Sequence, residues 1–139
     1  MLEIKIIKNK SDLEKAMVIR RKVFVDEQNV PECIEIDEFE TEATHILALR
    51  DGQPVGTARW RVTATGIKLE RFAVLSEFRG SHIGADLLKF TLDIIDTKAT
   101  IYLFSQISAV GFYEKYGFAN RGKIFYEANI PHRKMILVK

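Results

Sequence analysis

The stretch LSEFRGSHIGADLLKF, Leu75–Phe90, is the most informative part of the chain about its fold, because it joins a strand to a helix through a tight loop. From Ile83 onward, apolar residues return at helical spacing. The first N–H groups of such a helix lack intrahelical acceptors and carry partial positive charge. Gly80 and Gly84 permit close approach of backbone, and Arg79 adds a guanidinium fork. Taken alone, the stretch is compatible with a phosphate-binding loop and with a plain helix start.

Length and composition predict one domain over residues 1–139, with 47% hydrophobic and 29% charged residues. The net charge of +2 comes from 21 basic and 19 acidic residues, a balance that does not favour nucleic acid as a partner. No apolar run reaches the length of a membrane span, and MLEIKIIKNK lacks the apolar core of a signal peptide. Cys33 is the single cysteine and cannot form an intrachain disulfide. We expect a cytoplasmic protein that does not bind membranes, and the residues leave open whether it forms a homodimer.

The first half of the chain predicts a strand, a helix and a series of hairpins. EIKIIK at Glu3–Lys8 alternates, and Ser11 followed by Glu14 forms a capping box that would open a helix. Pro31 ends this helical region and an acidic segment predicted as loop follows it. The dipeptides Asp51–Gly52 and Thr65–Gly66 then mark turns between three strands, THILALR, PVGTARWRV and IKLERFAV.

Arg20 falls in the middle of the apolar face of the first helix, which is formed by Leu13, Ala16, Met17, Val23 and Phe24. A buried guanidinium has to be paired. The acidic residues Glu35, Asp37 and Glu38 follow the same helix and are candidate partners. We expect a structural clamp, with recognition of a substrate as the less favoured role.

The second half predicts two further helices, a buried strand and a final strand pair. The stripe of the helix after the loop is Ile83, Leu87, Leu88, Ile94 and Ile95. TIYLFS is a buried strand, ISAVGFYEKYGF is a helix that ends at Gly117, and two strands flank Asn129–Pro131. The resulting order, β-α-β-β-β-α-β-α-β-β, predicts an α/β domain with a mixed sheet.

Two motifs together show that the chain resembles the GNAT superfamily of acetyl-CoA-dependent N-acetyltransferases. The family's pyrophosphate-loop pattern, Arg/Gln-x-x-Gly-x-Gly/Ala, is similar to RGSHIG at Arg79–Gly84. Its later pattern, Ala-x-x-Phe-Tyr-x-x-x-Gly-Phe, is matched at Ala109–Phe118. The segments IRRKVFVDEQNVPECIEIDEFE and EANIPHRKM further resemble the small bacterial ElaA-like or YjcF-like branch. His82 departs from the pattern, because the family has glycine there.

The resemblance implies a GNAT fold of class α/β (α+β): a single mixed, mostly antiparallel sheet with a splayed central pair of strands and helices on both faces. It also implies that acetyl-CoA is the co-substrate, that no metal takes part, and that an amine of a small molecule or peptide attacks the thioester without a covalent enzyme intermediate. The alternative is a non-catalytic acyl-CoA-binding or interaction module on the same fold. The residues that would bind the cofactor are Phe72, Ala73, Val74, Arg79, Gly80, Ser81, His82, Ile83, Gly84, Ala85, Ala109 and Phe112.

For the proton transfers, the resemblance implies that Tyr113 is the acid that protonates the departing thiolate. Glu70 on the preceding strand is the first candidate for the base that deprotonates the amine. Glu27, Glu127 and His132 are the further candidates, and they are expected on the acceptor-binding side together with Trp60. Each of these groups could instead be an ordinary surface charge or an ion-pair partner. If the loop requires a left-handed backbone at His82, a side chain there would introduce strain of about 1–2 kcal/mol.

Overall fold

The computed structural model describes all 139 residues and contains a seven-stranded sheet of order β1-β2-β3-β4-β5-β7-β6. The β4–β5 pair is parallel and the other neighbours are antiparallel, which confirms the predicted mixed, mostly antiparallel sheet. None of the helices is both long and apolar enough to cross a bilayer. The elements in chain order are β1 (Leu2–Ile6), α1 (Lys10–Arg20), the π-helix η1 (Arg21–Glu27), α2 (Glu32–Glu35), β2 (Thr44–Arg50), β3 (Gln53–Thr63), β4 (Gly66–Val74), the 3-10 turn η2 (Ser76–Phe78), α3 (Ile83–Ile94), β5 (Ile101–Gln106), the 3-10 turn η3 (Ile107–Ala109), α4 (Val110–Glu114), β6 (Phe118–Glu127) and β7 (Ile130–Leu137).

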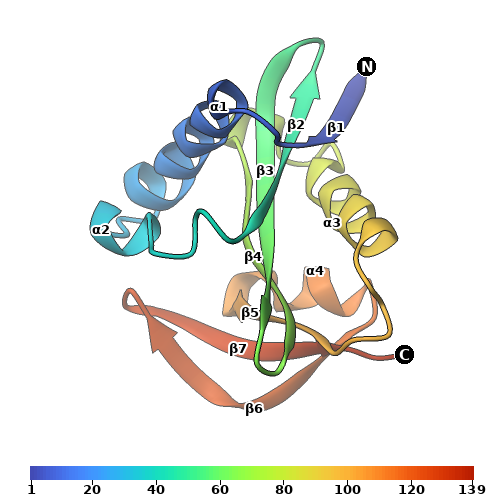
Figure 1. Ribbon diagram of the computed structural model, residues 1–139. Helices are drawn as coiled ribbons and strands as arrows, with labels where there is room; N and C mark the ends of the chain where they lie inside the picture. The colour runs from blue at the N-terminus through green and yellow to red at the C-terminus, as the bar shows by residue number, and fades with distance from the viewer.

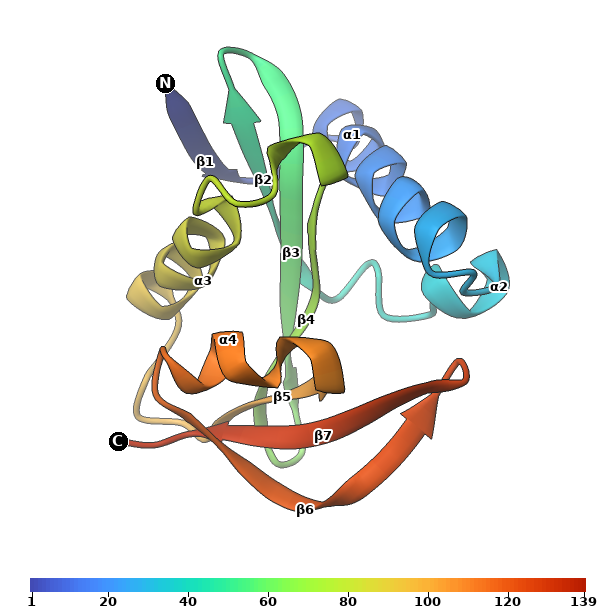
Figure 2. The same ribbon diagram turned by 180° about the vertical axis from the view of Figure 1, so that it is seen from behind.

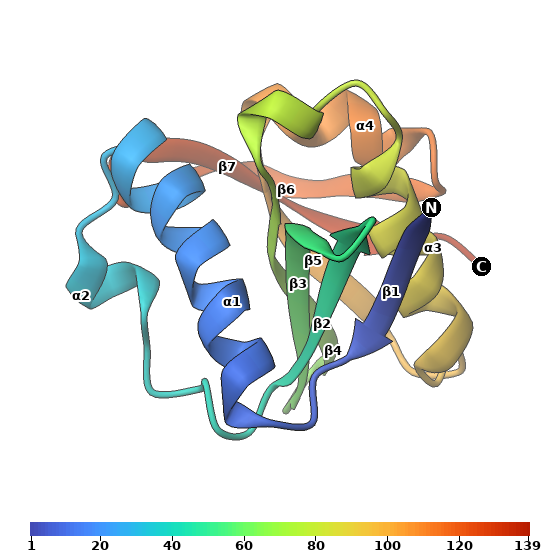
Figure 3. The ribbon, with the colours of Figure 1, turned by 90° about the horizontal axis from the view of Figure 1, so that it is seen from above.

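Helices cover both faces of the sheet, as predicted (Figures 1 and 3). Along β2, Ile46 and Ala48 belong to a core cluster shared with α3 and Tyr113 of α4. Leu47 and Leu49 point the other way into a second cluster with α1. This alternation is the period of two expected for a strand buried on both faces. Seen from behind, α1 and α3 lie on opposite sides of β3 (Figure 2).

Residues with left-handed backbone form two hairpin turns, the first at the predicted Asp51–Gly52 and the second just before the predicted Asn129–Pro131, because Ile130 and Pro131 already belong to β7. Asp51 and Gly52 have φ of 49° and 84° between β2 and β3. Ala128 and Asn129 have φ of 50° and 62° between β6 and β7. Paired positive φ values suit the twist of two-residue hairpins. Gly66 is required for a second reason, because a Cβ there would lie 2.2 Å from the carbonyl oxygen of Thr100.

The central strands β4 and β5 separate after a short ladder. Only Ile67–Leu69 pairs with Ile101–Leu103, although both strands continue beyond these residues. β4 also contains one extra residue, because Glu70 to Ala73 spans the same length as Arg59 to Thr57 on β3. This bulge includes Arg71, whose φ of 58° is left-handed. The predicted splay is therefore present, and a bulge adjoins it.

Four local predictions are wrong in detail. Asn9, not Ser11, caps α1: its backbone is extended and its side chain accepts a hydrogen bond from the N–H of Asp12 at 2.8 Å, so Ser11 is already helical. The acidic segment holds the short helix α2 rather than only loop. Ile94 is 44% exposed because α3 ends there. The helix predicted before Gly117 is divided into η3 and α4, although Gly117 has the expected positive φ of 94°.

Candidate active site

A cleft of about 930 Å³ opens where β4 and β5 separate. Residues far apart in the sequence line it: the end of η1, the bulged part of β4, the loop before α3, the end of β5, α4 and the β6–β7 turn. Most of the predicted site residues are therefore brought together. They are Glu70, Phe72, Ala73, Val74, Arg79, Gly80, His82, Ile83, Gly84, Ala85, Ala109, Phe112, Tyr113, Glu127 and His132.

Three predicted residues do not line the cleft. Trp60 is 9% exposed and belongs to the main core cluster, so it packs the sheet rather than contacting an acceptor. The hydroxyl of Ser81 donates to the carbonyl of Phe78 within the loop. Glu27 lies outside the cleft and binds Arg79.

The loop before α3 presents a row of unpaired backbone donors. The N–H groups of Gly80–Ala85 find no acceptor in the protein, backbone or side chain. The last four precede or begin α3, where the helix dipole adds positive potential. His82 has φ 67° and ψ 14°, which is left-handed backbone, and its side chain makes no capping bond. Such a cradle of N–H groups suits a diphosphate.

The guanidinium of Arg79 is bonded within the protein rather than free for a phosphate. Its Nη1 and Nη2 each donate to a carboxylate oxygen of Glu27 at 2.8 Å. Its Nε donates to the carbonyl oxygen of Val74 at 3.0 Å. Both side chains of the pair are more than one-third exposed. Arg79 thus ties η1 to the loop and to the end of β4.

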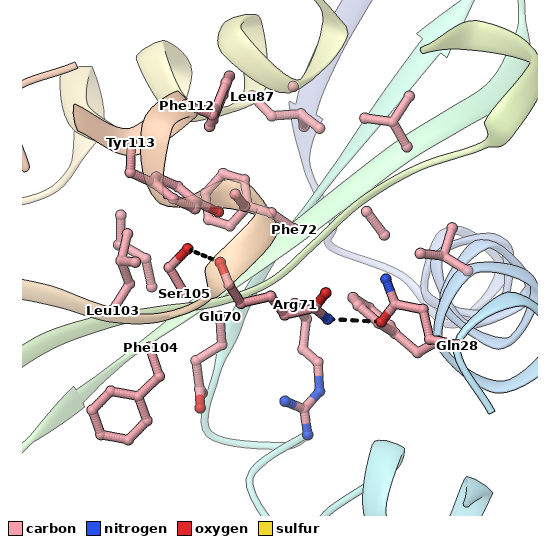
Figure 4. Close-up of a pocket in the computed structure, with 18 of the residues that line it drawn as sticks. Gln28, Glu70, Arg71, Phe72, Leu87, Leu103, Phe104, Ser105, Phe112 and Tyr113 are labelled. Atoms are coloured by element: carbon pink, nitrogen blue, oxygen red, sulfur yellow. Dashed lines mark hydrogen bonds between the residues drawn. The ribbon is translucent and has the colours of Figure 1, made fainter. Parts of the chain in front are cut away.

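Tyr113 reaches the gap between the strands from α4. Its ring meets Phe72 edge-on, with centroids 6.3 Å apart, and also contacts Phe112 and Phe118. Figure 4 shows Tyr113 on one side of β4, with Glu70 and Arg71 directed to the other side. Burial raises the pKa of Tyr113, so its hydroxyl keeps its proton at neutral pH.

Glu70 is surrounded by cations. Its carboxylate lies 2.8 Å from Arg61 Nε, 3.1 Å from Arg59 Nη2 and 3.1 Å from Lys68 Nζ. Burial alone would raise the pKa of Glu70, but these three partners outweigh it and hold the pKa below its ordinary value. A carboxylate stabilised in this way is a weak base. The role of Glu70 as base stays a prediction, and its surroundings oppose it.

His132 and Glu127 line the opposite wall, near the β6–β7 turn. His132 stacks on Phe125, with centroids 5.8 Å apart, and its Nδ1 lies 2.7 Å from the carbonyl oxygen of Ile130. Because a carbonyl only accepts, Nδ1 carries the proton and the neutral ring keeps Nε2 as an acceptor. Glu127 is exposed and forms no ion pair.

An amide pair that the sequence did not reveal closes part of the cleft. Gln106 Nε2 donates to Gln28 Oε1 at 2.7 Å and so connects the end of β5 to the end of η1. The dashed line at Gln28 in Figure 4 marks this bond. Both residues line the cleft. The position of Gln28 within the Val-Phe-Val-x-Glu-Gln segment was a signal, but no local pattern marks Gln106.

Arg20 is a structural clamp, as predicted. It is 1% exposed, and its guanidinium lies 3.1 Å from Glu35 and 2.7 Å from Glu40. The buried side chain of Arg59 joins the same cluster through Asp37 at 2.7 Å and Glu40 at 2.9 Å. Of the predicted partners only Glu35 bonds Arg20, since Asp37 bonds Arg59 and Arg71 instead and Glu38 forms no ion pair. Arg59 was not predicted because only the fold places β3 beside the acidic segment.

A cradle of N–H groups beside a gap between two strands suits an anionic ligand, and it fits the site that the sequence resemblance implies for a coenzyme A-dependent acyltransferase. The chain belongs to this class, and more narrowly to the family described as Acetyltransferase (GNAT) domain, whose model matches residues 8–139. The resemblance that the two sequence motifs indicated is thus confirmed.

Relatives and solved structures place the chain within the expected branch. The uncharacterized N-acetyltransferase YjcF of Bacillus subtilis is 40% identical over 134 residues, covering 94% of this chain and 96% of that protein. The crystal structure of Escherichia coli ElaA superimposes with a TM-score of 0.89 at 25% identity, covering 99% of this chain and 100% of that one. An acyl-CoA N-acyltransferase from Pseudomonas aeruginosa gives the same TM-score of 0.89, identity of 25% and coverage of 99% and 100%.

Proposed function

We propose that this acyltransferase transfers the acetyl group of acetyl-CoA to an amine of a small molecule or peptide by direct attack. The observation that carries the proposal is the position of Tyr113, whose protonated hydroxyl lies at the gap where the thioester would sit beside the row of free N–H groups. Family membership supports the acyl transfer and the use of acetyl-CoA.

In this proposal the N–H groups of Gly80–Ala85 bind the pyrophosphate of CoA, and the unpaired edge of β4 binds the pantetheine arm. The carbonyl of Val74 already accepts a bond from Arg79, and the backbone of Ala73 is paired with Thr57 of β3, so strand-like contacts fall mainly to the backbone of Phe72. Ala109 and Phe112 line the same part of the cleft and cover the arm. A Cβ added at Gly84 would make only ordinary contacts, the nearest being the ring of Phe112 at 3.8 Å.

The reaction requires one bond to form and one to break. The amine nitrogen forms a bond to the thioester carbonyl carbon, the C–S bond breaks, and its electron pair goes to sulfur. The thiolate takes the proton of Tyr113, which is replaced from solvent. The ammonium form of the acceptor loses one proton before attack, and the nitrogen loses a second as the amide forms. No enzyme nucleophile is needed, and Cys33 is exposed and does not line the cleft.

His132 suits the role of base better than Glu70. Its Nε2 is available as an acceptor, and histidine is the side chain most often used for general base catalysis. In the register of β5 and β7 it stands opposite Gln106, whose side chain crosses the cleft, so both project to the same face of the sheet. We therefore propose His132 as the base, with Glu127 as a carboxylate on the same wall.

Replacing Tyr113 with Phe tests the proposal. We expect kcat for CoA release to fall by roughly 10²- to 10⁴-fold, the usual contribution of a positioned acid. Thermal stabilisation by CoA should persist, because the ring still packs on Phe72. Tyr126→Phe is the matched control, since Tyr126 is 70% exposed and lies outside the cleft. Unchanged turnover would contradict the acid role. CoA binding without thiol release across a broad amine panel would favour the non-catalytic module.

A further inference from the structure

A cluster of nine charged side chains, here named the charged floor, lies at the acceptor side of the cleft; six of them line the cleft and three lie behind these. Five are cations, Arg20, Arg59, Arg61, Lys68 and Arg71, and four are carboxylates, Glu35, Asp37, Glu40 and Glu70. The remaining titratable neighbour, His45, donates from Nε2 to the carbonyl of Glu40, and burial lowers its pKa, which keeps it neutral. The charged floor therefore has an excess of one positive charge.

The carboxylate oxygens of the charged floor are all occupied. Both oxygens of each of the four acids lie within bonding distance of at least one Arg, Lys or backbone N–H group. A ligand that enters from the cleft therefore meets no unpaired carboxylate in this cluster, and an ammonium group would have to compete with cations that are already bound.

Donors, in contrast, remain free. Arg61 bonds Glu70 only through Nε, which leaves Nη1 and Nη2 without an acceptor in the protein. Arg71 uses Nε and Nη2 on Glu35, Asp37 and the carbonyl of Ile34, which leaves its Nη1 free. Both residues line the cleft, and none of these free nitrogens is sealed from solvent. Arg59 Nε is a further donor without an acceptor, but it is buried.

The free donors are held in place rather than mobile. Arg61 lies over the ring of Phe39, with Cζ 3.7 Å from the centroid, while Glu70 fixes its Nε. Arg71 stands in the bulge of β4 with φ 58°, a conformation that costs a residue other than glycine about 1–2 kcal/mol. Strained backbone of this kind is common at ligand sites. Rigid guanidinium edges match the two oxygens of a carboxylate.

Resting on the function proposed above, we propose that the acceptor is an amine that also carries a carboxylate, which Arg61 and Arg71 bind while the amine reaches the thioester. Glu70 is then a positioning residue that orients Arg61. Glu127 does not neutralise the excess positive charge of the charged floor, because it lies on the opposite wall of the cleft and forms no ion pair with the floor.

The test compares matched acceptors that differ only in having a carboxylate or a carboxamide. β-Alanine with β-alaninamide, and glycine through longer ω-amino acids with their carboxamides, are assayed for acetyl-CoA-dependent release of CoA thiol. We expect the acids to have kcat/KM roughly 10- to 100-fold above their amides, the effect of charge-assisted hydrogen bonds. Arg61→Gln should remove most of this preference, and Arg71→Gln part of it. Arg121→Gln, an exposed arginine on β6, should leave the preference intact.

A binding measurement keeps the proposal falsifiable if turnover is low. With CoA present, N-acetyl-β-alanine should raise the Tm more than N-acetyl-β-alaninamide, and Arg61→Gln should abolish the difference. Glu70 keeps Lys68 and Arg59 as available partners in this variant, so we expect the fold to be retained. Equal binding of both compounds, binding of neither, or equal turnover of acids and amides would overturn the carboxylate proposal alone. Failure of CoA itself to stabilise the protein would overturn the acyltransferase proposal.

Discussion

The two ends of the cleft differ in their polar groups. One end, at Gly80–Ala85, presents backbone N–H groups without acceptors. The other end is bounded by the charged floor, whose nine side chains bond one another. The first end uses atoms that every residue except proline possesses. The second depends on the identity of each side chain and on tertiary contacts between α1, the acidic segment, β3 and β4.

This difference separates the two tasks of the site. A cofactor of fixed structure can be bound by backbone donors at a helix N-terminus, where sequence matters only for close approach. An acceptor has to be selected, and selection requires side chains whose substitution changes affinity. Substitutions at the charged floor should therefore change stability and acceptor choice, while those at the loop should change mainly cofactor binding.

The largest effect is expected from removing a partner inside the charged floor. Arg20→Ala leaves Glu35 and Glu40 buried without their main partner, and breaking a buried pair in this way costs about 3–5 kcal/mol. Urea unfolding at neutral pH measures the loss. Lys22→Ala, an exposed position just after α1, is the control and should change the free energy of unfolding little. A loss below about 1 kcal/mol for Arg20→Ala would mean that the charged floor stabilises the fold no more than ordinary surface ion pairs do.

Acidification should remove part of the same stability. Burial alone would raise the pKa of Asp37, but Arg59 holds it well below the ordinary value, and the pKa values of Glu40 and Glu70 are lowered by similar pairing. These groups therefore stabilise the fold fully above their unfolded pKa of about 4, and the stabilisation is lost as pH falls below it. Burial raises the pKa of Glu35, which acts in the opposite direction for that one residue.

The pH effect is checked by measuring the free energy of unfolding of wild type and Asp37→Asn from neutral pH down to pH about 3. Asp37→Asn should show a shallower fall than wild type. Asp93→Asn, an exposed position on α3, should follow the wild-type curve. Parallel curves for wild type and Asp37→Asn would contradict the assigned pKa of Asp37.

Local patterns explain why much of the fold was predictable. The turn at Asp51–Gly52, the helix start at Ile83 and the glycine at 117 depend on neighbouring residues, and the structure contains all of them. The cap was predicted at Ser11 instead of Asn9 because two residues suited to capping stand two positions apart, and only the backbone conformation distinguishes them.

The parts of the site that sequence did not reveal depend on contacts between distant segments. The bond between Gln28 and Gln106 joins residues 78 positions apart. Arg59 became buried because the acidic segment folds over β3, and Trp60, next to it, points into the opposite core. Local sequence patterns do not indicate which face of a strand a distant segment of the chain will cover.

At the loop the expected effects are smaller. His82→Gly removes the strain of a left-handed residue, about 1–2 kcal/mol, but gives the unfolded chain more entropy, which offsets about 0.5–1 kcal/mol. A net stabilisation of about 0.5–1 kcal/mol and equal or tighter CoA binding are expected from thermal unfolding and titration calorimetry. His82→Ala, which keeps the strain, should gain neither. Equal behaviour of the glycine and alanine variants would show that the left-handed backbone is not strained.

The smallest change in stability is expected for Glu27→Gln. The pair of Glu27 and Arg79 is more than one-third exposed on both sides, and such pairs contribute at most about 1 kcal/mol.

The same substitution removes a negative charge beside the proposed pyrophosphate site and frees the guanidinium of Arg79 for a phosphate. CoA should therefore bind more tightly, by a few-fold at low salt and less at high salt, because screening weakens exposed charges. Titration of CoA at two salt concentrations measures this effect, and Glu14→Gln on α1, an exposed acid outside the cleft, is the control. Weaker CoA binding by Glu27→Gln would show instead that Glu27 holds Arg79 in the position that the cofactor requires. Glu27 would then position an arginine, as Glu70 is proposed to do for Arg61 in the charged floor.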